Sequence, residues 1–229
     1  MILQINEMFD YLSKIDTQLT LLLNGSDSEF IDLIAFTATK TSTWIPLAVV
    51  LLYVVVRSNN WKNVCIFVLG VALAITLADQ VASGVFKPLV ARLRPSHEPA
   101  LQGLIDLVNG YRGGRYGFFS SHAANTCAVS TFVALLYKNK GLTVALYSWT
   151  LLNCWTRAYL GVHYVSDLLV GLLWGLCVGF MLHFMIRKFY VKYSPQIFQN
   201  IFTTSRANVL INALMLTYLS IVVYAIVVG

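Results

Sequence analysis

The stretch WKNVCIFVLGVALAITLADQVASGVF, residues 61–86, decides the fold of this chain. A helix needs about 20 mainly apolar residues to cross a hydrocarbon core about 30 Å thick. This stretch meets that length with two ionisable residues, Lys62 at its start and Asp79 further along. It predicts a transmembrane helix, and the rest of the chain repeats the pattern.

Five further apolar runs lie near 30–57, 120–137, 141–158, 163–186 and 207–228, and Pro46 is expected to kink the first. The 229 residues are 58% hydrophobic and 11% charged, which excludes an ordinary soluble domain. We therefore predict an all-α fold with a single membrane-embedded domain over residues 1–229. It is expected to be a bundle of about six transmembrane helices.

The N-terminal stretch MILQINEMFDYLSKIDTQ has no basic start, so it does not read as a cleavable signal peptide. Its apolar residues recur at helical spacing, at Ile5, Met8, Phe9, Leu12, Ile15 and Leu19. The pattern predicts an amphipathic helix. Two placements remain open, one lying on the membrane interface and one packed on the bundle.

Basic residues mark the short connections between spans one and two, three and four, and five and six. They are Arg57, Lys62, Lys138, Lys140, Arg187, Lys188, Lys192 and Arg206. The positive-inside rule places these connections in the cytoplasm. The net charge of +6 is thus a topology signal, and no nucleic-acid partner is expected. The long connection 87–119 then faces the periplasm or the extracellular side of a multi-pass inner-membrane protein.

A second basic group contradicts this rule, because it falls on the predicted outer face. Its members are Lys87, Arg92, Arg94, Arg112, Arg115 and Arg157. Cations on that side need another purpose, and binding an anion supplies one.

Three polar stretches stand at the outer ends of the predicted spans. They read KPLVARLRP (87–95), FFSSHAAN (118–125) and TRAYLGVHYVSD (156–167). Phosphoryl transfer needs fixed donors for the phosphoryl oxygens, which Lys87, Arg94 and Arg157 can supply. Lys87 and Arg94 are seven residues apart, so they share one face if that stretch is helical.

The second and third stretches carry groups suited to catalysis. Ser120 and Ser121 begin a span, where a helix N-terminus offers N–H groups to a phosphate oxygen. His122 follows in the first turn, within reach to protonate a leaving oxygen. His163 and Asp167 are four apart, so a carboxylate can fix the imidazole tautomer and leave the other nitrogen to attack phosphorus.

At these residues the chain resembles the type 2 phosphatidic acid phosphatase (PAP2) family, whose site is related to that of vanadium haloperoxidases. The family pattern is K-x6-R-P, then P-S-G-H, then S-R-x5-H-x3-D. It is matched by Lys87, Arg94, Pro95, Ser120, His122, Arg157, His163 and Asp167. Phe119, Ser121 and Thr156 depart from it, standing where the family has Pro, Gly and Ser.

The resemblance implies a membrane lipid phosphatase that needs no metal or other cofactor. It assigns the nucleophile to His163, which forms a phosphohistidine, and the acid to His122. Candidate substrates are undecaprenyl diphosphate, which the small size of the chain favours, phosphatidylglycerol phosphate, phosphatidic acid and the phosphates of lipid A. A phosphotransferase using the same site is the alternative. An anion transporter fits less well, because the charged residues gather at one face.

Two features are left without an assigned role. Asp79 either packs helices together through a hydrogen bond or supports the basic cluster. The glycine-rich stretch NGYRGGRYG (109–117), with Arg112 and Arg115, is either a flexible loop or a lid that contacts a second phosphate. The oligomeric state cannot be read from the sequence.

Overall fold

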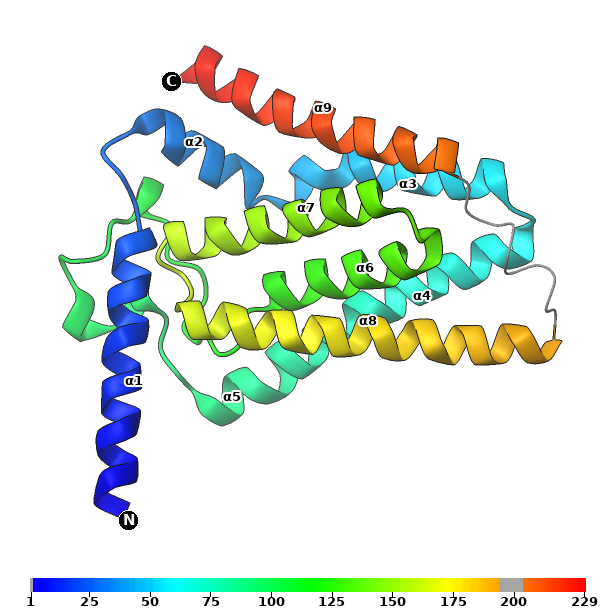
Figure 1. Ribbon diagram of the computed structural model, residues 1–229. Helices are drawn as coiled ribbons and strands as arrows, with labels where there is room; N and C mark the ends of the chain where they lie inside the picture. Colours follow the sequence, from blue (N-terminus) through cyan, green and yellow to red (C-terminus); the bar gives the residue numbers. More distant parts are fainter. Residues whose placement is uncertain (1, 194–203) are drawn as a thin grey trace.

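The computed structural model describes residues 2–193 and 204–229, and these residues form helices joined by turns and one long connection (Figure 1). The helices are α1 (Ile2–Leu23), α2 (Glu29–Ala38), α3 (Ile45–Ser58), α4 (Trp61–Asp79), α5 (Lys87–Val90), α6 (Ser121–Tyr137), α7 (Lys140–Tyr159), α8 (Val165–Tyr193) and α9 (Thr204–Val228). Within the described ranges, extended pairing is limited to one isolated bridge, between Leu93 and Tyr116. The prediction of an all-α fold is confirmed.

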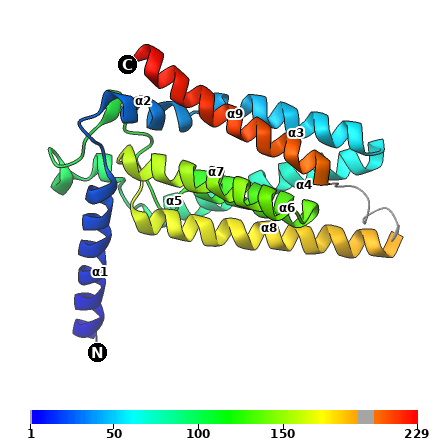
Figure 2. The same cartoon turned by 45° about the horizontal axis from the view of Figure 1, so that its top comes forward.

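Helix α6 forms the centre of the bundle, packed against α4, α7 and α8 (Figures 1 and 2). Its sequence, SHAANTCAVSTFVALLY, is rich in small residues, and most of its side chains are buried. On α8, Gly171 and Gly175 face the α6 backbone so closely that an added Cβ would lie 2.6 Å and 2.5 Å from carbonyl oxygens of α6 and its cap. Small residues at such spacing let two membrane helices approach closely, which fixes the α6–α8 distance.

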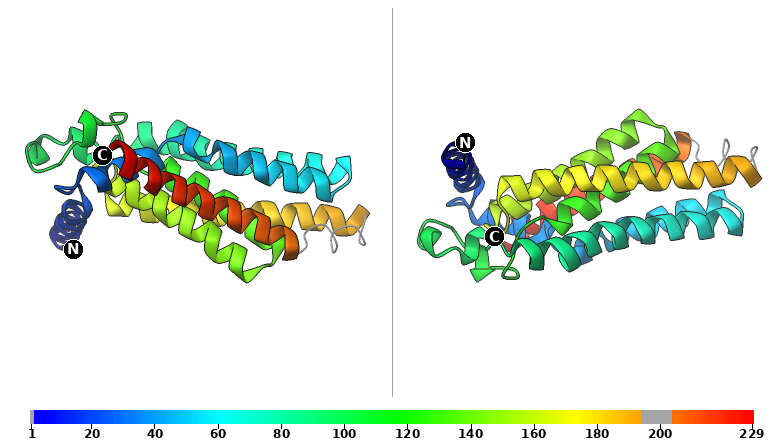
Figure 3. Two further views of the ribbon diagram at one scale, coloured as in Figure 1. Left: turned by 90° about the horizontal axis from the view of Figure 1, so that it is seen from above. Right: turned by 90° about the horizontal axis from the view of Figure 1, so that it is seen from below.

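Four helical segments in the described ranges are long and apolar enough to cross a membrane: Thr41–Ser58, Trp61–Val90, Val165–Phe189 and Arg206–Val228. Helices α6 and α7, the third and fourth predicted spans, run alongside them (Figure 3). Their boundaries fall within about two residues of those expected from the sequence. The total of six spans remains a prediction.

The first predicted span is not one helix with a kink at Pro46, as the sequence suggested. Helix α2 ends at Ala38, a short 3-10 turn covers Thr41–Trp44, and α3 starts at Ile45. Pro46 lies in the first turn of α3, where its missing N–H costs no hydrogen bond. The interruption therefore precedes the proline, and it leaves Thr39 at the C-terminus of α2.

The α3–α4 and α6–α7 connections, the end of α8 and the start of α9 lie at one end of the bundle, whereas α1 and the end of α9 lie at the other (Figure 1). The guanidinium of Arg206 donates to the carbonyl of Ser58 at 3.4 Å, joining the start of α9 to the α3–α4 turn. The predicted grouping of the connections is thus reproduced, although the connection 187–206 includes residues 194–203, which are outside the described residues. Which end faces the cytoplasm stays a prediction.

Helix α1 runs crosswise to the bundle helices at the end that carries the 91–119 connection (Figure 1). Many of its apolar side chains are exposed, including Phe9, Tyr11 and Leu22. Asp16, near its middle, is held by Arg92 at 2.8 Å. Thr20 also accepts the backbone N–H of Val165, so α1 contacts the bundle at more than one residue, and its place in the membrane interface stays a prediction.

Candidate active site

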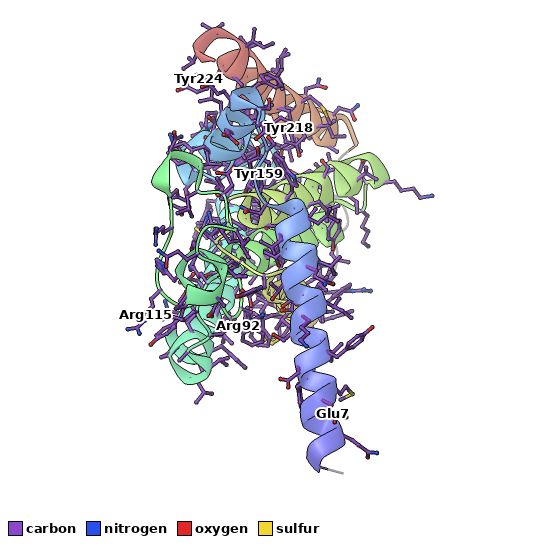
Figure 4. The ribbon with its side chains drawn as sticks, turned by 90° about the vertical axis from the view of Figure 1, so that its left-hand side faces the viewer. Glu7, Arg92, Arg115, Tyr159, Tyr218 and Tyr224 are labelled. Atoms are coloured by element: carbon purple, nitrogen blue, oxygen red, sulfur yellow. The ribbon has the colours of Figure 1, made fainter. Side chains whose placement is uncertain are left out.

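The three sequence stretches with catalytic residue types meet at the end of the bundle that carries α1. Figure 4 looks onto this end, with Arg92 beside α1 and Arg115 on the outer edge. Three parts of the chain contribute to this end. They are the end of the continuous helical segment Trp61–Val90, which includes α4 and α5, the start of α6, and the turn between α7 and α8. Residues distant in sequence thereby surround one small region.

His163 lies in the turn before α8, two residues before the helix that the sequence pattern had placed it on. Its Nδ1 is 3.4 Å from Oδ2 of Asp167, which sits in the first turn of α8. Both side chains are buried, at 1% and 0% exposure. Nδ1 is engaged by the carboxylate, so Nε2 is the nitrogen left for an incoming group.

Asp167 is held from several sides. Its Oδ2 accepts the backbone N–H of Tyr164 at 3.1 Å, and its Oδ1 accepts from Arg92 at 3.0 Å. Its backbone carbonyl accepts the N–H of Ser120 at 3.0 Å, which ties the start of α8 to the start of α6. Gly117 packs beside it, where a Cβ would lie 2.8 Å from Oδ2. The carboxylate therefore has little freedom to move away from His163.

Lys87, the first residue of α5, contacts the start of α6. Its Nζ donates to Oγ of Ser121 at 2.6 Å and to Oγ of Ser83 at 3.0 Å. Ser83 in turn contacts Oδ1 of Asp79 at 3.3 Å. The open question about Asp79 is thus answered in favour of support for the basic cluster, through one intervening hydroxyl.

Arg94 does not share a helix face with Lys87, contrary to the sequence expectation. Helix α5 ends at Val90, because Ala91 adopts a left-handed conformation with φ 49°. Arg94 itself is extended, and its Nε donates to the carbonyl of Tyr116 at 3.1 Å. The turn at Ala91 redirects the chain, so Arg94 joins the site from the loop.

The Arg94 guanidinium is buried, at 7% exposure, and its NH1 has no hydrogen-bond partner. Gly113 lies against it with φ +64°, and a Cβ there would come within 2.7 Å of NH1. A buried guanidinium with an unpaired N–H is a costly arrangement unless a ligand completes it. An anion would do so.

Arg157 is buried near the C-terminus of α7, at 2% exposure. Its NH1 donates to Oγ1 of Thr39 at 2.6 Å, at the break between α2 and α3. Both terminal nitrogens also lie 3.4–3.5 Å from the hydroxyl of Tyr111. Its Nε has no partner, as with Arg94 NH1.

The start of α6 follows the sequence prediction. Ser120 is the N-cap, and its Oγ accepts the N–H of Ala123 at 3.4 Å. His122 lies in the first turn, partly buried. The loop 109–117 is attached to the site, because Ser96 and Arg112 exchange hydrogen bonds and Tyr116 accepts from Arg94. Arg112 and Arg115 remain exposed.

The electrostatics favour a neutral His163. Burial, followed by the positive charges of Arg94 and Arg157, holds the pKa of its imidazole well below the usual value of 6.5. Burial and the charge of Arg157 likewise lower the pKa of Arg94 to about 10, so this side chain is still cationic at neutral pH. A neutral imidazole near guanidinium groups that each keep one N–H without a partner is suited to attack on an anionic electrophile.

A family model described as the PAP2 superfamily matches residues 63–191, which is more than half of the chain. This chain belongs to the PAP2 superfamily. The match includes all three stretches that build the site, so the resemblance inferred from their motifs is confirmed.

Two curated relatives of this PAP2 chain are named lipid A 4'-phosphatase. One, from Bacteroides thetaiotaomicron, is 39% identical over 182 residues, covering 79% of this chain and 81% of the relative. The other, from Porphyromonas gingivalis, is 32% identical over 180 residues, covering 79% of this chain and 75% of the relative. Membership and these relatives identify the PAP2 chain as a membrane lipid phosphatase.

A crystal structure of a transmembrane PAP2-type phosphatidylglycerolphosphate phosphatase from Bacillus subtilis has the same fold. The TM-score is 0.59 at 19% sequence identity, covering 78% of this chain and 87% of that one. At that identity the likeness concerns the fold alone, and it confirms a multi-pass transmembrane architecture for the PAP2 chain.

Sequence reasoning missed several residues that position the site in this PAP2 chain. Asp16 and Ser166 bind Arg92, and Thr39 and Tyr111 bind Arg157. Thr39 and Tyr111 carry no charge and match no motif, so no sequence signal singled them out. Asp16 gave no signal either, because a carboxylate on the polar face of an amphipathic helix is the ordinary case.

Proposed function

We propose that this PAP2 protein hydrolyses a lipid phosphate through a phosphohistidine on Nε2 of His163. The supporting observation is the pair of buried guanidinium groups, Arg94 and Arg157, each with an unpaired N–H near a neutral imidazole. Together with Lys87 they would neutralise the charge on the phosphoryl oxygens. Ser120 and the Ser121 amide, at the N-terminus of α6, would hold one further oxygen.

In the first step, Nε2 of His163 forms a bond to phosphorus and the bond from phosphorus to the lipid oxygen breaks. His122 gives a proton to that leaving oxygen, so the lipid departs as an alcohol. In the second step, water attacks phosphorus, a proton returns to His122, and the P–N bond breaks to release inorganic phosphate. Asp167 keeps the His163 tautomer fixed throughout.

We further propose that the substrate is a phosphate of lipid A. Two relatives with the same name, at 39% and 32% identity over most of their length, favour this choice over undecaprenyl diphosphate, the preference drawn from the sequence. The grouping of basic connections at the opposite end of the bundle supports a site that faces the periplasm.

The test is phosphate release by the purified protein from a panel containing lipid A, undecaprenyl diphosphate, phosphatidylglycerol phosphate and phosphatidic acid. Lipid A should react fastest. His163→Ala should lower turnover on the order of 10³-fold or more. Acid-labile, base-stable ³²P on the wild-type protein, absent from His163→Ala, would support the intermediate. Near-normal turnover by a folded His163→Ala protein would refute it.

The phosphotransferase alternative is separated by product analysis. A hydrolase releases inorganic phosphate at the same rate with or without an added acceptor lipid. Acceptor-dependent loss of that phosphate, matched by a newly phosphorylated lipid, would favour transfer.

A further inference from the structure

Three side chains form a closed ring of hydrogen bonds where the segment Trp61–Val90 meets the start of α6. Lys87 Nζ lies 2.6 Å from Oγ of Ser121 and 3.0 Å from Oγ of Ser83, and the two hydroxyl oxygens are 3.1 Å apart. Ser121 is buried, at 8% exposure. It stands where the PAP2 pattern has glycine, so the family motif does not account for its hydroxyl.

A π-helical turn over Gln80–Phe86 aligns the part of this ring that precedes α5. Asp79, Ser83 and Lys87 follow one another at intervals of four residues, and each contacts the next. Lys87 donates to Ser83, and Ser83 donates to Oδ1 of Asp79 at 3.3 Å. Turns of this kind are rare and occur frequently at functional sites. The direction of these bonds determines where each hydroxyl hydrogen goes.

The hydrogen of Ser121 has a weaker partner than that of Ser83. A serine hydroxyl has one hydrogen to donate and two lone pairs that accept, whereas an ammonium group only donates. Because the Ser83 hydrogen goes to the Asp79 carboxylate, the contact between the two serines uses the hydrogen of Ser121. The usual distance for such a bond is about 2.7–2.8 Å, so the contact at 3.1 Å is a weak one. A better acceptor can therefore replace Ser83.

An oxygen of a bound phosphoryl group would be that acceptor. Hydrogen bonds to an ionised acceptor are roughly twice as strong as those between neutral groups. Lys87 is proposed to bind a phosphoryl oxygen, and Oγ of Ser121 lies 2.6 Å from its Nζ. An oxygen about 2.8 Å from Nζ is within hydrogen-bonding reach of a hydroxyl at that separation, so it can accept from both groups.

From these contacts we propose that the Ser121 hydroxyl is a further phosphate-binding group, which donates to the phosphoryl oxygen that Lys87 binds. Asp79 is a positioning residue in this arrangement, because it takes the Ser83 hydrogen and leaves Ser83 as an acceptor. When the lipid phosphate binds, the Ser121 hydrogen turns from Ser83 to the phosphoryl oxygen, and Oγ keeps its bond from Lys87. The inference rests on the proposed function, since it assumes that Lys87 contacts the phosphoryl group.

Ser121→Ala tests the hydroxyl alone, because the backbone amide is kept. We expect kcat/KM for the lipid phosphate that the wild type cleaves fastest to fall about 10–100-fold, the range for one hydrogen bond to a charged group. The inhibition constant of orthovanadate should rise by a similar factor. Ser121→Gly should show the same losses, since glycine also lacks the hydroxyl.

The matched control is Ser130→Ala. Ser130 is a buried serine more than two turns further along α6, and its hydroxyl contacts Oγ1 of Thr150 at 2.9 Å. Its loss should leave kcat/KM and the inhibition constant unchanged. Melting temperatures in detergent would show that each variant is folded, and Ser121→Gly replaces Ser121→Ala if alanine is not tolerated.

A second comparison separates direct contact with phosphate from an effect through Lys87. Ser121→Ala is made in the wild type and in Lys87→Met, and orthovanadate binding is measured in all four proteins by isothermal calorimetry, which needs no turnover. A hydroxyl that only holds the lysine in place would lose its effect once the lysine is gone. We expect Ser121→Ala to weaken binding at least about threefold in Lys87→Met as well.

No further loss in the Lys87→Met background would overturn the inference, as would equal constants for Ser121→Ala and Ser130→Ala. Either result would leave the losses in His163→Ala and Lys87→Met intact. A failure of the proposed function looks different, because His163→Ala would then retain turnover while Ser121→Ala still differed from Ser130→Ala.

Discussion

Arg92 bridges α1 and the catalytic turn, because its NH1 lies 3.0 Å from Oδ1 of Asp167 while its NH2 lies 2.8 Å from Oδ2 of Asp16. Its guanidinium also stacks 3.8 Å from the ring centre of Tyr164. Asp167 thus contacts His163 through one oxygen and Arg92 through the other. Helix α1 is thereby linked to the proposed nucleophile through two ion pairs.

Arg92→Met should reduce both activity and stability. It leaves the buried Asp167 carboxylate without its cation, a loss of about 1–3 kcal/mol. Turnover should fall roughly 10–100-fold, as for other groups that hold a reacting side chain in place. Phosphate release and the melting temperature in detergent would measure these effects. Asp16→Asn should be milder, because Arg92 keeps Asp167. Arg115→Met, at an exposed cation, is the control, and an equal loss there would contradict the prediction.

Thr39→Val should weaken the site through Arg157. The 2.6 Å bond from NH1 to the threonine hydroxyl is charge-assisted, and the loss of such a bond costs about 1.5–3 kcal/mol. We expect kcat/KM to fall about 10–100-fold with the fold retained. Thr76→Val, at an exposed position of α4, is the matched control. An unchanged kcat/KM for Thr39→Val would mean that Tyr111 alone suffices to hold Arg157.

His122→Ala should affect substrates according to their leaving group. Alkoxide departure needs a proton, so formation of the phosphoenzyme from a lipid phosphate should slow about 10²–10⁴-fold. Para-nitrophenolate departs without one, so the same step should slow far less. Rapid-quench measurement of the first turnover separates this step from hydrolysis. His97→Ala serves as a control in the loop, and equal slowing on both substrates would contradict an acid role.

The lowered pKa of His163 predicts a ring that stays neutral below pH 6.5. The unfolded chain binds a proton near pH 6.5 that the folded protein does not, so acidification in this range should lower the stability of the fold. NMR of ¹⁵N-labelled histidine should show that the His163 imidazole is still neutral at a pH where an exposed histidine is already protonated. The resonance is assigned by its absence from His163→Ala. A midpoint at or above 6.5 would be inconsistent with the electrostatics of the site.

Chelators should leave activity unchanged, because Lys87, Arg94 and Arg157 supply the positive charge that a metal would otherwise provide. Vanadate should inhibit, since it can adopt the geometry of a phosphoryl group in transfer. Phosphate release after dialysis against EDTA, with and without added Mg²⁺ or Zn²⁺, is the measurement. Loss of activity that one of these ions restores would point to a metal site.

The sequence by itself determined the helices, because hydrophobic runs of membrane length and the N-cap at Ser120 are local signals. It also determined the residue types of the site, since Lys87, Arg94, His122 and His163 fall in fixed spacings that identify the family. Two predictions about backbone conformation were wrong, namely the kink at Pro46 and the helix assumed between Lys87 and Arg94. The interruption before Pro46 and the left-handed Ala91 depend on contacts that periodicity does not record.

Only the tertiary structure decided how these residues are connected. The turn at Ala91 brings Arg94 to the site from the loop. Arg157 donates a hydrogen bond to Thr39, and Arg92 links Asp167 to α1. A cavity beside His122 likewise arises where five helices fail to fill the space between them. Such contacts join residues far apart in the sequence, 118 positions in the Arg157–Thr39 bond, and they are set by packing in three dimensions.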